Sequence, residues 1–323
     1  MRYIDLFCGI GGFRIAMQNA SERLRVSSEC VFSSDIDLDA QIAYETNFNE
    51  KPFGDITQIA AKDIPDHDLL LGGFPCQAFS IIGNRKGFED IRGTLFFDIA
   101  RILDEKRPAA FVLENVKQLM SHDGGRTLSR ILKVLEDLGY QVRFKVLNAL
   151  DFGVPQKRER IFLVGFREPR AFSWPSGGVT MKPLSEILEK EVSDFYSASE
   201  RIRLNRLEKK PDNHRLDEPT IWHENKGGHV SAYPFSCALR AGASYNYLLV
   251  NGLRRLTERE MLRLQGFPES FKIACGYGAT RKQAGNSVAV PCVTAVIGAT
   301  LDALRTSPVL ATKRTSQTAF AFA

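Results

Sequence analysis

A cysteine, a glutamate and two arginines each lie next to a short apolar run that is typical of a β-strand. Cys76 lies in the segment GGFPCQ, Glu114 follows the run FVL, and Arg158 and Arg160 precede the run IFLVGF. A cysteine thiolate can add to an electron-poor carbon, and a carboxylic acid with a raised pKa can protonate a ring nitrogen. Taken singly, these residues also fit a buried cysteine, a helix-start glutamate and an edge-strand pair. Their occurrence together at strand ends indicates one catalytic site.

A glycine-rich turn follows the first strand-like run. The sequence FCGIGG at 7–12 leads into a helix that we expect to begin near Phe13, and Asp35 ends the next strand-like run. Glycines in the first β–α turn let a ligand approach the backbone, and an acidic side chain after the second strand can hydrogen-bond a ribose. The spacing departs from G-x-G-x-x-G, so a tight turn without a ligand is an equal alternative for this segment alone.

A long turn-rich segment follows Cys76. Residues 80–93 carry Arg85, Lys86 and Arg92 together with glycines at 83, 87 and 93. A basic, glycine-hinged loop beside a nucleophile predicts a lid over an anionic substrate. The alternative is a solvated surface loop.

The first half of the chain alternates strand-like and helix-like patterns. Helices are expected at 94–103 and 127–138, where apolar residues recur every three or four positions. The expected strands are Tyr3–Phe7, Cys30–Ser33, Leu69–Leu71, Ala110–Leu113, Arg143–Leu147 and Ile161–Val164. This alternation predicts an α/β fold with a doubly wound, mostly parallel sheet.

The alternation ends after Phe166. Residues 167–248 are richer in Ser, Pro, Asn and Gly, and their basic stretch at 201–215 is interpreted as a solvated helix face. Thr257 and Glu260 then match the T-x-x-E pattern of a capping box, and a last helix is expected after Pro291. We expect a catalytic and cofactor-binding domain at 1–169 that is completed by 284–312, and a smaller, irregular domain at 170–283.

The charge balance is mild. The chain has 43 Lys and Arg against 38 Asp and Glu, a net charge of +5, which excludes a histone-like polycation but allows a basic cleft. The six cysteines contain no C-x-x-C pair, so neither a metal site nor a disulfide framework is expected. The N-terminal sequence has no signal-peptide pattern, and no apolar run is long enough to span a bilayer. We expect a cytoplasmic protein that acts away from membranes.

The motifs, taken in order, resemble those of the C5-cytosine DNA methyltransferases, most closely the short bacterial type II modification methylases. The resemblance rests on DLFCGIGGF at 5–13, GGFPCQAFS at 72–80, LENV at 113–116, PQKRERIF at 155–162, RRLTEREMLRLQGFP at 254–268 and QAGNSVAVP at 283–291. It implies a Rossmann-like fold that uses S-adenosylmethionine. It leaves out about residues 167–235, where the family keeps its variable target-recognition region.

The resemblance also implies roles for individual residues. Cys76 would attack C6 of cytosine, Glu114 would bond N3 and the exocyclic amine, and Arg160 would contact O2, with Arg158 in support. The residues implied for the cofactor are Phe7, Gly9, Gly11, Gly12, Asp35 (ribose), Ile36, Asp55 (adenine amine), Ile56, Pro75, Asn286 and Ser287. The basic loop at 80–93 is expected to supply the DNA contacts, from Ser80, Arg85, Lys86 and Arg92.

The implied reaction moves a methyl group from S-adenosylmethionine to C5 of a cytosine flipped out of a specific duplex sequence, with S-adenosylhomocysteine as product. The expected partners are double-stranded DNA and a restriction endonuclease that acts on the same site without a stable complex, and a monomer is expected. The nearest alternative is an RNA cytosine-5 methyltransferase that resembles the tRNA-modifying branch. A silent DNA-binding regulator should have lost Cys76 or Glu114, and a nicotinamide-dependent oxidoreductase would explain neither the PCQ nor the arginine motif.

Overall fold

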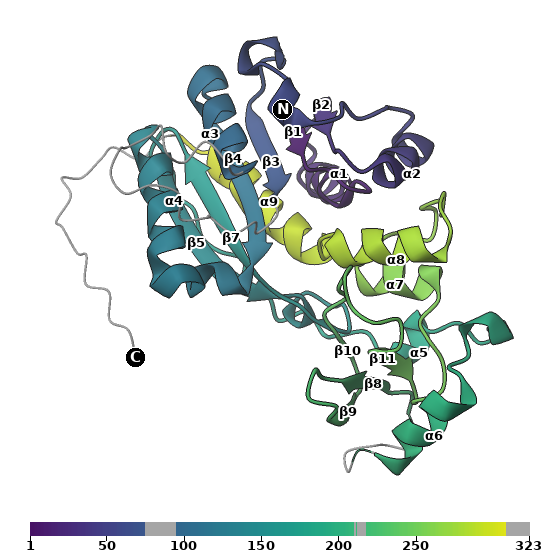
Figure 1. The fold of residues 1–323 in the computed structure, drawn as a ribbon. Coiled ribbons are helices and arrows are strands. Elements are labelled where there is room, and N and C mark those ends of the chain that lie inside the picture. The colour runs from purple at the N-terminus through teal and green to yellow at the C-terminus, as the bar shows by residue number, and fades with distance from the viewer. Residues whose placement is uncertain (75–94, 210, 212–217, 308–323) are drawn as a thin grey trace.

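A six-stranded β-sheet forms the centre of the larger domain in the computed structural model, which describes residues 1–74, 95–209, 211 and 218–307. The strand order is β2-β1-β3-β4-β7-β5 (Figure 1). The strands are β1 (Arg2–Leu6), β2 (Glu29–Ser34), β3 (Leu69–Gly73), β4 (Ala110–Val116), β5 (Gln141–Asn148) and β7 (Glu159–Phe166). Each expected strand overlaps one of these. The strands β2, β1, β3 and β4 pair in parallel, which confirms the mostly parallel sheet.

One strand, β7, runs antiparallel to both of its neighbours. Only ten residues separate Asn148, the end of β5, from Glu159, the start of β7, and they hold a 3-10 helix (Ala149–Asp151) and the short β6 (Gln156–Lys157). A parallel return needs a crossover connection of about a dozen or more residues, usually a helix. The short connection therefore reverses the direction of the chain.

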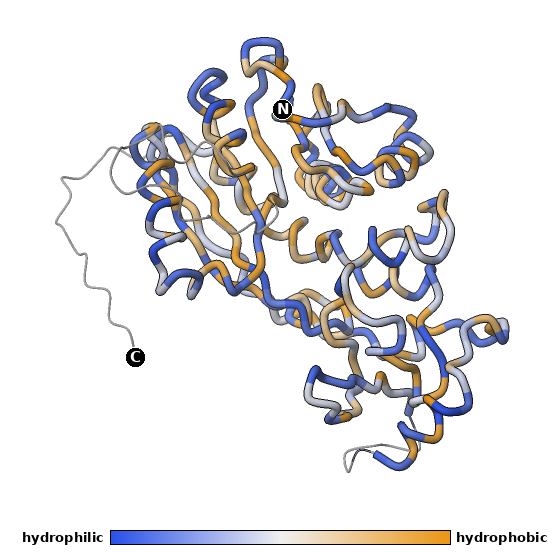
Figure 2. Tube along the Cα trace, viewed as in Figure 1, coloured by the Kyte–Doolittle hydropathy of each residue, from blue (hydrophilic) through white to orange (hydrophobic). Residues whose placement is uncertain are grey.

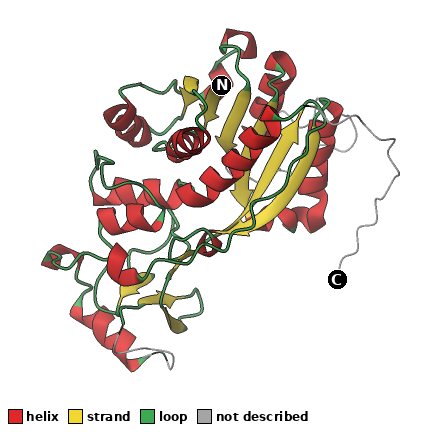
Figure 3. Cartoon of the chain, turned by 180° about the vertical axis from the view of Figure 1, so that it is seen from behind, coloured by secondary structure: helices red, strands yellow, loops and turns green. Residues whose placement is uncertain are grey.

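Helices cover both faces of the sheet, as Figure 3 shows from behind. Alternate residues of the strands face opposite layers: Tyr3 and Leu69 belong to one hydrophobic core, whereas Ile4 and Leu70 belong to the other. The first core contains residues of α1 (Gly12–Leu24), α2 (Leu38–Phe48) and α9 (Val290–Arg305), and the second contains residues of α3 (Leu95–Lys106) and α4 (Arg126–Asp137). The apolar strands of the sheet are visible in Figure 2. This two-sided burial is the physical basis of the doubly wound pattern in the sequence.

The apolar character of the C-terminal helices comes from this core position. Tyr277–Arg305, which includes α9, contains an 18-residue window that is apolar enough to cross a membrane by length and composition, and 67% of that window is buried inside the protein. Because α9 packs against α1 and the sheet, its apolar residues have a core to fill.

The irregular region folds into a smaller domain around a second sheet. Its antiparallel strand order is β11-β8-β9, and β10 pairs in parallel with β6 of the larger domain. The elements are α5 (Leu184–Ile187), α6 (Glu200–Glu208), β8 (Ile221–Glu224), β9 (Val230–Tyr233), β10 (Ser236–Cys237), β11 (Leu248–Val250), α7 (Glu258–Leu264) and α8 (Tyr277–Asn286). The expected capping box at Thr257 and Glu260 is present at the start of α7.

The two domains meet at α7 and α8. Met261 of α7 and Ala284 of α8 belong to the core of the smaller domain, whereas Leu262, the next residue of α7, belongs to a core of the larger domain. Phe172 and Phe267 also pack in the larger core, although both fall within 170–283. The joint is therefore a shared packed layer.

Further 3-10 helices lie in the connections of both domains. They are Ile56–Gln58, Ala61–Asp63, Lys117–Met120, His122–Gly125 and Asp194–Tyr196.

Candidate active site

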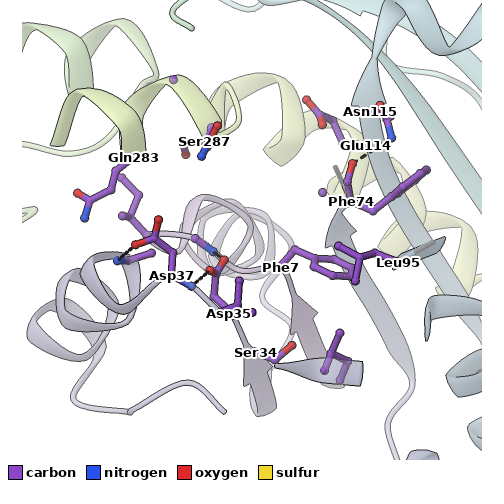
Figure 4. A pocket seen from close by; sticks show the side chains of 18 of the residues that line it. Phe7, Ser34, Asp35, Asp37, Phe74, Leu95, Glu114, Asn115, Gln283 and Ser287 are labelled. Atoms are coloured by element: carbon purple, nitrogen blue, oxygen red, sulfur yellow. Dashed lines mark hydrogen bonds between the residues drawn. The ribbon is translucent and has the colours of Figure 1, made fainter. Parts of the chain in front are cut away.

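A pocket of about 590 Å³ opens at the carboxyl ends of β1, β2, β3 and β4. Ser34 and Asp35 lie at one end of it, and Glu114 and Asn115 lie at the other (Figure 4). Ligands of open α/β sheets bind at this edge of the strands. The pocket also receives Asn286 and Ser287 from the end of α8, so it is lined by segments far apart in the sequence.

The turn after β1 forms the floor of the pocket in an unusual backbone conformation. Phe7 has φ 56° and Gly9 has φ 53°, both in the left-handed region, and the turn is closed by a hydrogen bond from the Gly11 N–H to the Cys8 carbonyl at 2.8 Å. A residue with a bulky side chain such as Phe7 rarely adopts this backbone conformation, and such strained residues are concentrated at binding sites. The structure thus presents the backbone of this turn to the pocket.

Gly11 and Gly12 serve packing behind that floor and do not line the pocket. A Cβ on Gly11 would overlap the ring of Phe48, and one on Gly12 would lie 2.7 Å from a methyl carbon of Val288. Both glycines are therefore needed for the start of α1 to approach α2 and the segment before α9.

Asp35 links the turn after β1 to the start of the segment that follows β2. Its carboxylate accepts hydrogen bonds from the Gly9 N–H at 2.7 Å and from the Asp37 N–H at 2.8 Å. Burial raises the pKa of Asp35, and these two backbone donors oppose the rise. Asp55 accepts from the Thr57 N–H at 2.9 Å. Ile36, which follows Asp35 and is 71% exposed, also lines the pocket.

Glu114 and Arg160 form an ion pair at the inner end of the pocket. The distance from Arg160 Nε to Glu114 Oε1 is 3.0 Å, and the glutamate is buried. Burial raises the pKa of Glu114, and the nearby Arg160 and Arg158 lower it in part. The neighbouring Asn115 donates a hydrogen bond to the Phe74 carbonyl at 3.0 Å. The end of β3, which leads to Pro75 and Cys76, is therefore tied to the strand that carries the acid.

Arg158 is buried between the two domains. It donates hydrogen bonds to the carbonyl oxygens of Leu239 at 3.0 Å, Gly285 at 3.3 Å and Ser287. Burial, together with the neighbouring Arg160, lowers its pKa to about 9, and the Glu114 carboxylate opposes this shift. A buried guanidinium that satisfies three carbonyls joins the smaller domain to the pocket wall.

Comparisons with known proteins agree with this geometry. A sequence profile of the C-5 cytosine-specific DNA methylases matches residues 1–301. The chain belongs to the C-5 cytosine-specific DNA methylase family. The Type II methyltransferase M.NgoBI of Neisseria gonorrhoeae is 56% identical over 297 residues, which cover 90% of each chain. M.HaeII of Haemophilus aegyptius is 52% identical over 303 residues, which cover 93% of each chain.

The fold of this methylase is shared by solved structures of low sequence identity. The crystal structure of the Dnmt2 methyltransferase of S. pombe superposes with a TM-score of 0.71 at 24% identity, covering 95% of this chain and all of that one. The chain is thus a DNA cytosine-5-methyltransferase with a Rossmann-like fold, its family uses S-adenosylmethionine, and its substrate is double-stranded DNA. The family match does not favour the tRNA alternative.

The pocket of the methylase suits a nucleoside with a positive charge. Its lining includes Asp35, Asp37 and Asp55. Among the described residues that line it, the cationic side chains are Arg158 and Arg160, at the Glu114 end. A Cβ on Gly9 or Gly54 would meet no heavy atom within 4 Å, so the floor is open at both glycines. Carboxylates attract a sulfonium and repel a dinucleotide's phosphates, which favours S-adenosylmethionine over a nicotinamide cofactor.

The structure brings most of the predicted site residues of the methylase to this pocket. Those that line it are Phe7, Gly9, Asp35, Ile36, Asp55, Ile56, Glu114, Arg158, Arg160, Asn286 and Ser287. The predicted residues Pro75, Cys76, Ser80, Arg85, Lys86 and Arg92 lie outside the described residues. Within the described part of the chain, no group of three or more His, Cys, Asp and Glu residues could hold a metal ion.

The sequence analysis did not single out two residues of the methylase that hold other segments of the site in place, Gln156 and Asp37. Gln156 donates to the Leu264 carbonyl at 2.9 Å and accepts from the Leu239 N–H at 2.9 Å. Asp37 forms an ion pair with Lys282 of α8 at 2.6 Å, so it links the Asp35 end of the pocket to the C-terminal helices. Gln156 lies inside the quoted motif at 155–162, and Asp37 lies two residues after the predicted Asp35, but their partners are 83 and 245 residues away. Only the polar character of Gln156 before a buried strand signalled its role.

Proposed function

We propose that this chain is a Type II modification methylase that methylates C5 of one cytosine in a specific duplex sequence. The single observation that carries the proposal is the buried Glu114–Arg160 pair at the inner end of the pocket, beside the strand end that leads to Cys76. A base stacked in duplex DNA cannot reach this depth, so the cytosine must be flipped out, which costs about a few kcal/mol.

The side chains at the inner end of the pocket have separate roles in the reaction. The Cys76 thiolate adds to C6, and Glu114 acts as the general acid that gives a proton to N3 as charge develops there. Burial raises the pKa of Glu114, which favours this role. Arg160 donates to O2 of the same ring, and Arg158 holds the pocket wall behind it. Addition at C6 makes C5 nucleophilic toward an electrophilic methyl group. Later loss of the C5 proton to water and of the thiolate from C6, with return of the N3 proton to Glu114, restores the aromatic ring.

The outer end of the pocket holds the cofactor. Asp35 would accept hydrogen bonds from the ribose hydroxyls, Asp55 would accept one from the adenine amine, and Phe7, Ile36 and Ile56 would give the base an apolar surface, since all five line the pocket. S-adenosylmethionine supplies an electrophilic methyl group on a sulfonium, and S-adenosylhomocysteine is the product. Asn286 and Ser287 close the side where the methionine part lies.

The smaller domain selects the DNA sequence. We assign catalysis to 1–169 with 284–312 and target recognition to 170–283, with Ser80, Arg85, Lys86 and Arg92 as contacts to the DNA. Phosphate contacts position the duplex, and contacts to base edges specify the sequence. The methylase works as a monomer in the cytoplasm, on the nucleoid and away from membranes. It protects sites that a separate restriction endonuclease cleaves.

Two measurements test this function. Methyl transfer from labelled S-adenosylmethionine should occur on duplex DNA and not on tRNA. Bisulfite sequencing of DNA from a bacterial host that expresses the chain should show one methylated sequence. Transfer to tRNA alone, or methylated cytosines without a common sequence, would contradict the proposal.

A further inference from the structure

One short segment of the smaller domain, Ala238–Ala241, is held firmly at the edge of the active site. The Leu239 N–H donates to Gln156 Oε1 at 2.9 Å, and the Leu239 carbonyl accepts from Arg158 Nη1 at 3.0 Å. The next N–H, that of Arg240, donates to the Tyr247 hydroxyl at 2.9 Å. Three consecutive backbone polar groups are therefore fixed by side chains, two of them from the arginine motif of the larger domain.

The same segment lies directly against the wall of the pocket. A Cβ on Gly285 would overlap the backbone nitrogen of Ala241 and would lie 2.7 Å from the carbonyl carbon of Arg240. Gly285 immediately precedes Asn286 and Ser287, and all three line the pocket. Only a glycine allows this approach, so the position of Arg240 relative to the flipped-out base is set by backbone contact.

The side chain of Arg240 is exposed, although its backbone is fixed. The guanidinium carbon lies 4.8 Å from the centre of the Tyr247 ring, and no carboxylate of the described residues lies within 4.0 Å of it. Other arginines of this domain are used inside the fold, as in the pairs Arg206–Glu224 at 2.6 Å and Arg254–Glu260 at 2.8 Å. The charge of Arg240 is thus left available to a ligand.

We propose that Arg240 is a specificity-determining residue whose guanidinium donates two hydrogen bonds to O6 and N7 of a guanine in the major groove, close to the target cytosine. The proposal rests on the proposed role of the smaller domain in target recognition. A planar guanidinium oriented by stacking matches the two acceptors of guanine, whereas a phosphate contact requires charge alone. A rigid backbone makes that orientation reproducible, which base reading needs and phosphate binding does not.

The test compares substrates as well as variants. The target sequence is first mapped with the wild-type enzyme. Wild type, Arg240→Ala and Arg240→Lys are then assayed for kcat/KM on the mapped duplex, on duplexes with each base pair replaced in turn, and on duplexes with 7-deazaguanine at each guanine. Arg203→Ala is the charge-matched control, because Arg203 is exposed on α6, which lies far from α8 in Figure 1.

Arg240→Ala should abolish discrimination at one G·C pair, a loss of about 5- to 150-fold in the cognate-to-substituted ratio, and leave the other positions unchanged. 7-Deazaguanine at that pair should slow the wild type but not Arg240→Ala. Arg240→Lys keeps the charge without the planar fork and should restore only part of the ratio. Arg203→Ala should keep the wild-type ratios at every position.

Three results would overturn the proposal. Arg240→Ala could lower kcat/KM on every duplex by the same factor and reduce the slope of log affinity against log salt by about 1, which is the behaviour of a phosphate contact. Arg240→Lys could restore the full ratio, or the ratios could stay unchanged in Arg240→Ala. A wild-type enzyme without sequence preference would instead contradict the proposed function itself, so the two failures are distinct. Thermal melting and S-adenosylmethionine affinity show whether each variant is folded.

Discussion

The pocket of the larger domain and the segment Ala238–Ala241 of the smaller domain differ in how their charged side chains are held. In the pocket Glu114 and Arg158 are buried, and each is held by a fixed partner. In the smaller domain Arg240 is exposed. Its backbone N–H is held by the Tyr247 hydroxyl, and its guanidinium lies over the Tyr247 ring with no ion pair among the described residues. Proton transfer to a base benefits from a desolvated acid, whereas sequence reading needs donors that a groove can reach. The comparison indicates that the reaction depends on charged groups buried in the larger domain, whereas the choice of DNA sequence depends on groups exposed on the smaller domain. The DNA sequence that is methylated can therefore change while the reaction stays the same.

Exchange of the smaller domain should have the largest effect on this comparison. Replacing residues 167–247 by the matching segment of a family member with a different target should move methylation completely to the new sequence, because the buried acid and cofactor pocket stay in place. Bisulfite sequencing of host DNA measures the outcome. An active chimera that still marks the original sequence would assign the choice of site to the larger domain.

Loss of the buried acid should abolish most of the chemistry and leave the choice of site intact. Glu114→Gln keeps the size of the side chain but removes the proton donor, so kcat should fall by about 10²- to 10⁴-fold, whereas DNA affinity should change little. Glu159→Gln is the matched control, because Glu159 pairs with Lys117 at 2.9 Å outside the pocket. Single-turnover kinetics and gel-shift titration give the two quantities. Equal loss in both variants would argue against a special role for Glu114.

A smaller effect is expected at the cofactor end. Asp35→Ala removes an acceptor for the ribose and should weaken S-adenosylmethionine binding by about 1.5–3 kcal/mol, or roughly ten- to a hundred-fold, because the lost hydrogen bonds involve a charged group. DNA affinity should be nearly unchanged. Asp39→Ala, an exposed neighbour on α2, is the control. Calorimetry that finds the same cofactor affinity in Asp35→Ala and wild type would exclude the ribose role.

The smallest effect is expected at the start of α7. Thr257→Ala removes the cap of this helix and the hydrogen bond to Glu189 at 2.6 Å, and should lower the free energy of unfolding by about 1–2 kcal/mol. Thr257→Ser keeps the hydroxyl and should retain most of that stability. Denaturant unfolding and methylation assays on substituted duplexes measure the two properties. A change of sequence preference in Thr257→Ala would mean that this cap also positions the segment Ala238–Ala241.

The sequence predicted the larger domain well for a physical reason. Its strands are buried on both faces, so β3 and the first half of β4 read as short continuous apolar runs, and the chemistry-bearing residues follow them. The capping box was equally readable, because its two partners are three residues apart. The antiparallel direction of β7 could be inferred only from the short connection between β5 and β7.

The smaller domain could not be predicted in the same way. Its strands β8 and β11 have four and three residues, too few for a period to show. Two of the three contacts that fix Ala238–Ala241 come from Gln156 and Arg158, at separations of 83 and 81 residues along the chain. No local pattern encodes such contacts. The roles of Gly285 and Arg240 are therefore visible only in the folded chain.

The central claim is that Cys76 performs covalent catalysis on the flipped-out cytosine. A duplex with 5-fluorocytosine at the target should be methylated once and then remain attached to the protein, because the last step must remove the C5 substituent as a cation, which fluorine does not permit. Denaturing electrophoresis and peptide mapping should show an adduct at GGFPCQAFS that needs S-adenosylmethionine to become irreversible. Cys76→Ser should form no adduct and still bind DNA, since a hydroxyl is a far weaker nucleophile than a thiolate at neutral pH. An adduct that persists in Cys76→Ser, or one that maps to another cysteine, would contradict the account.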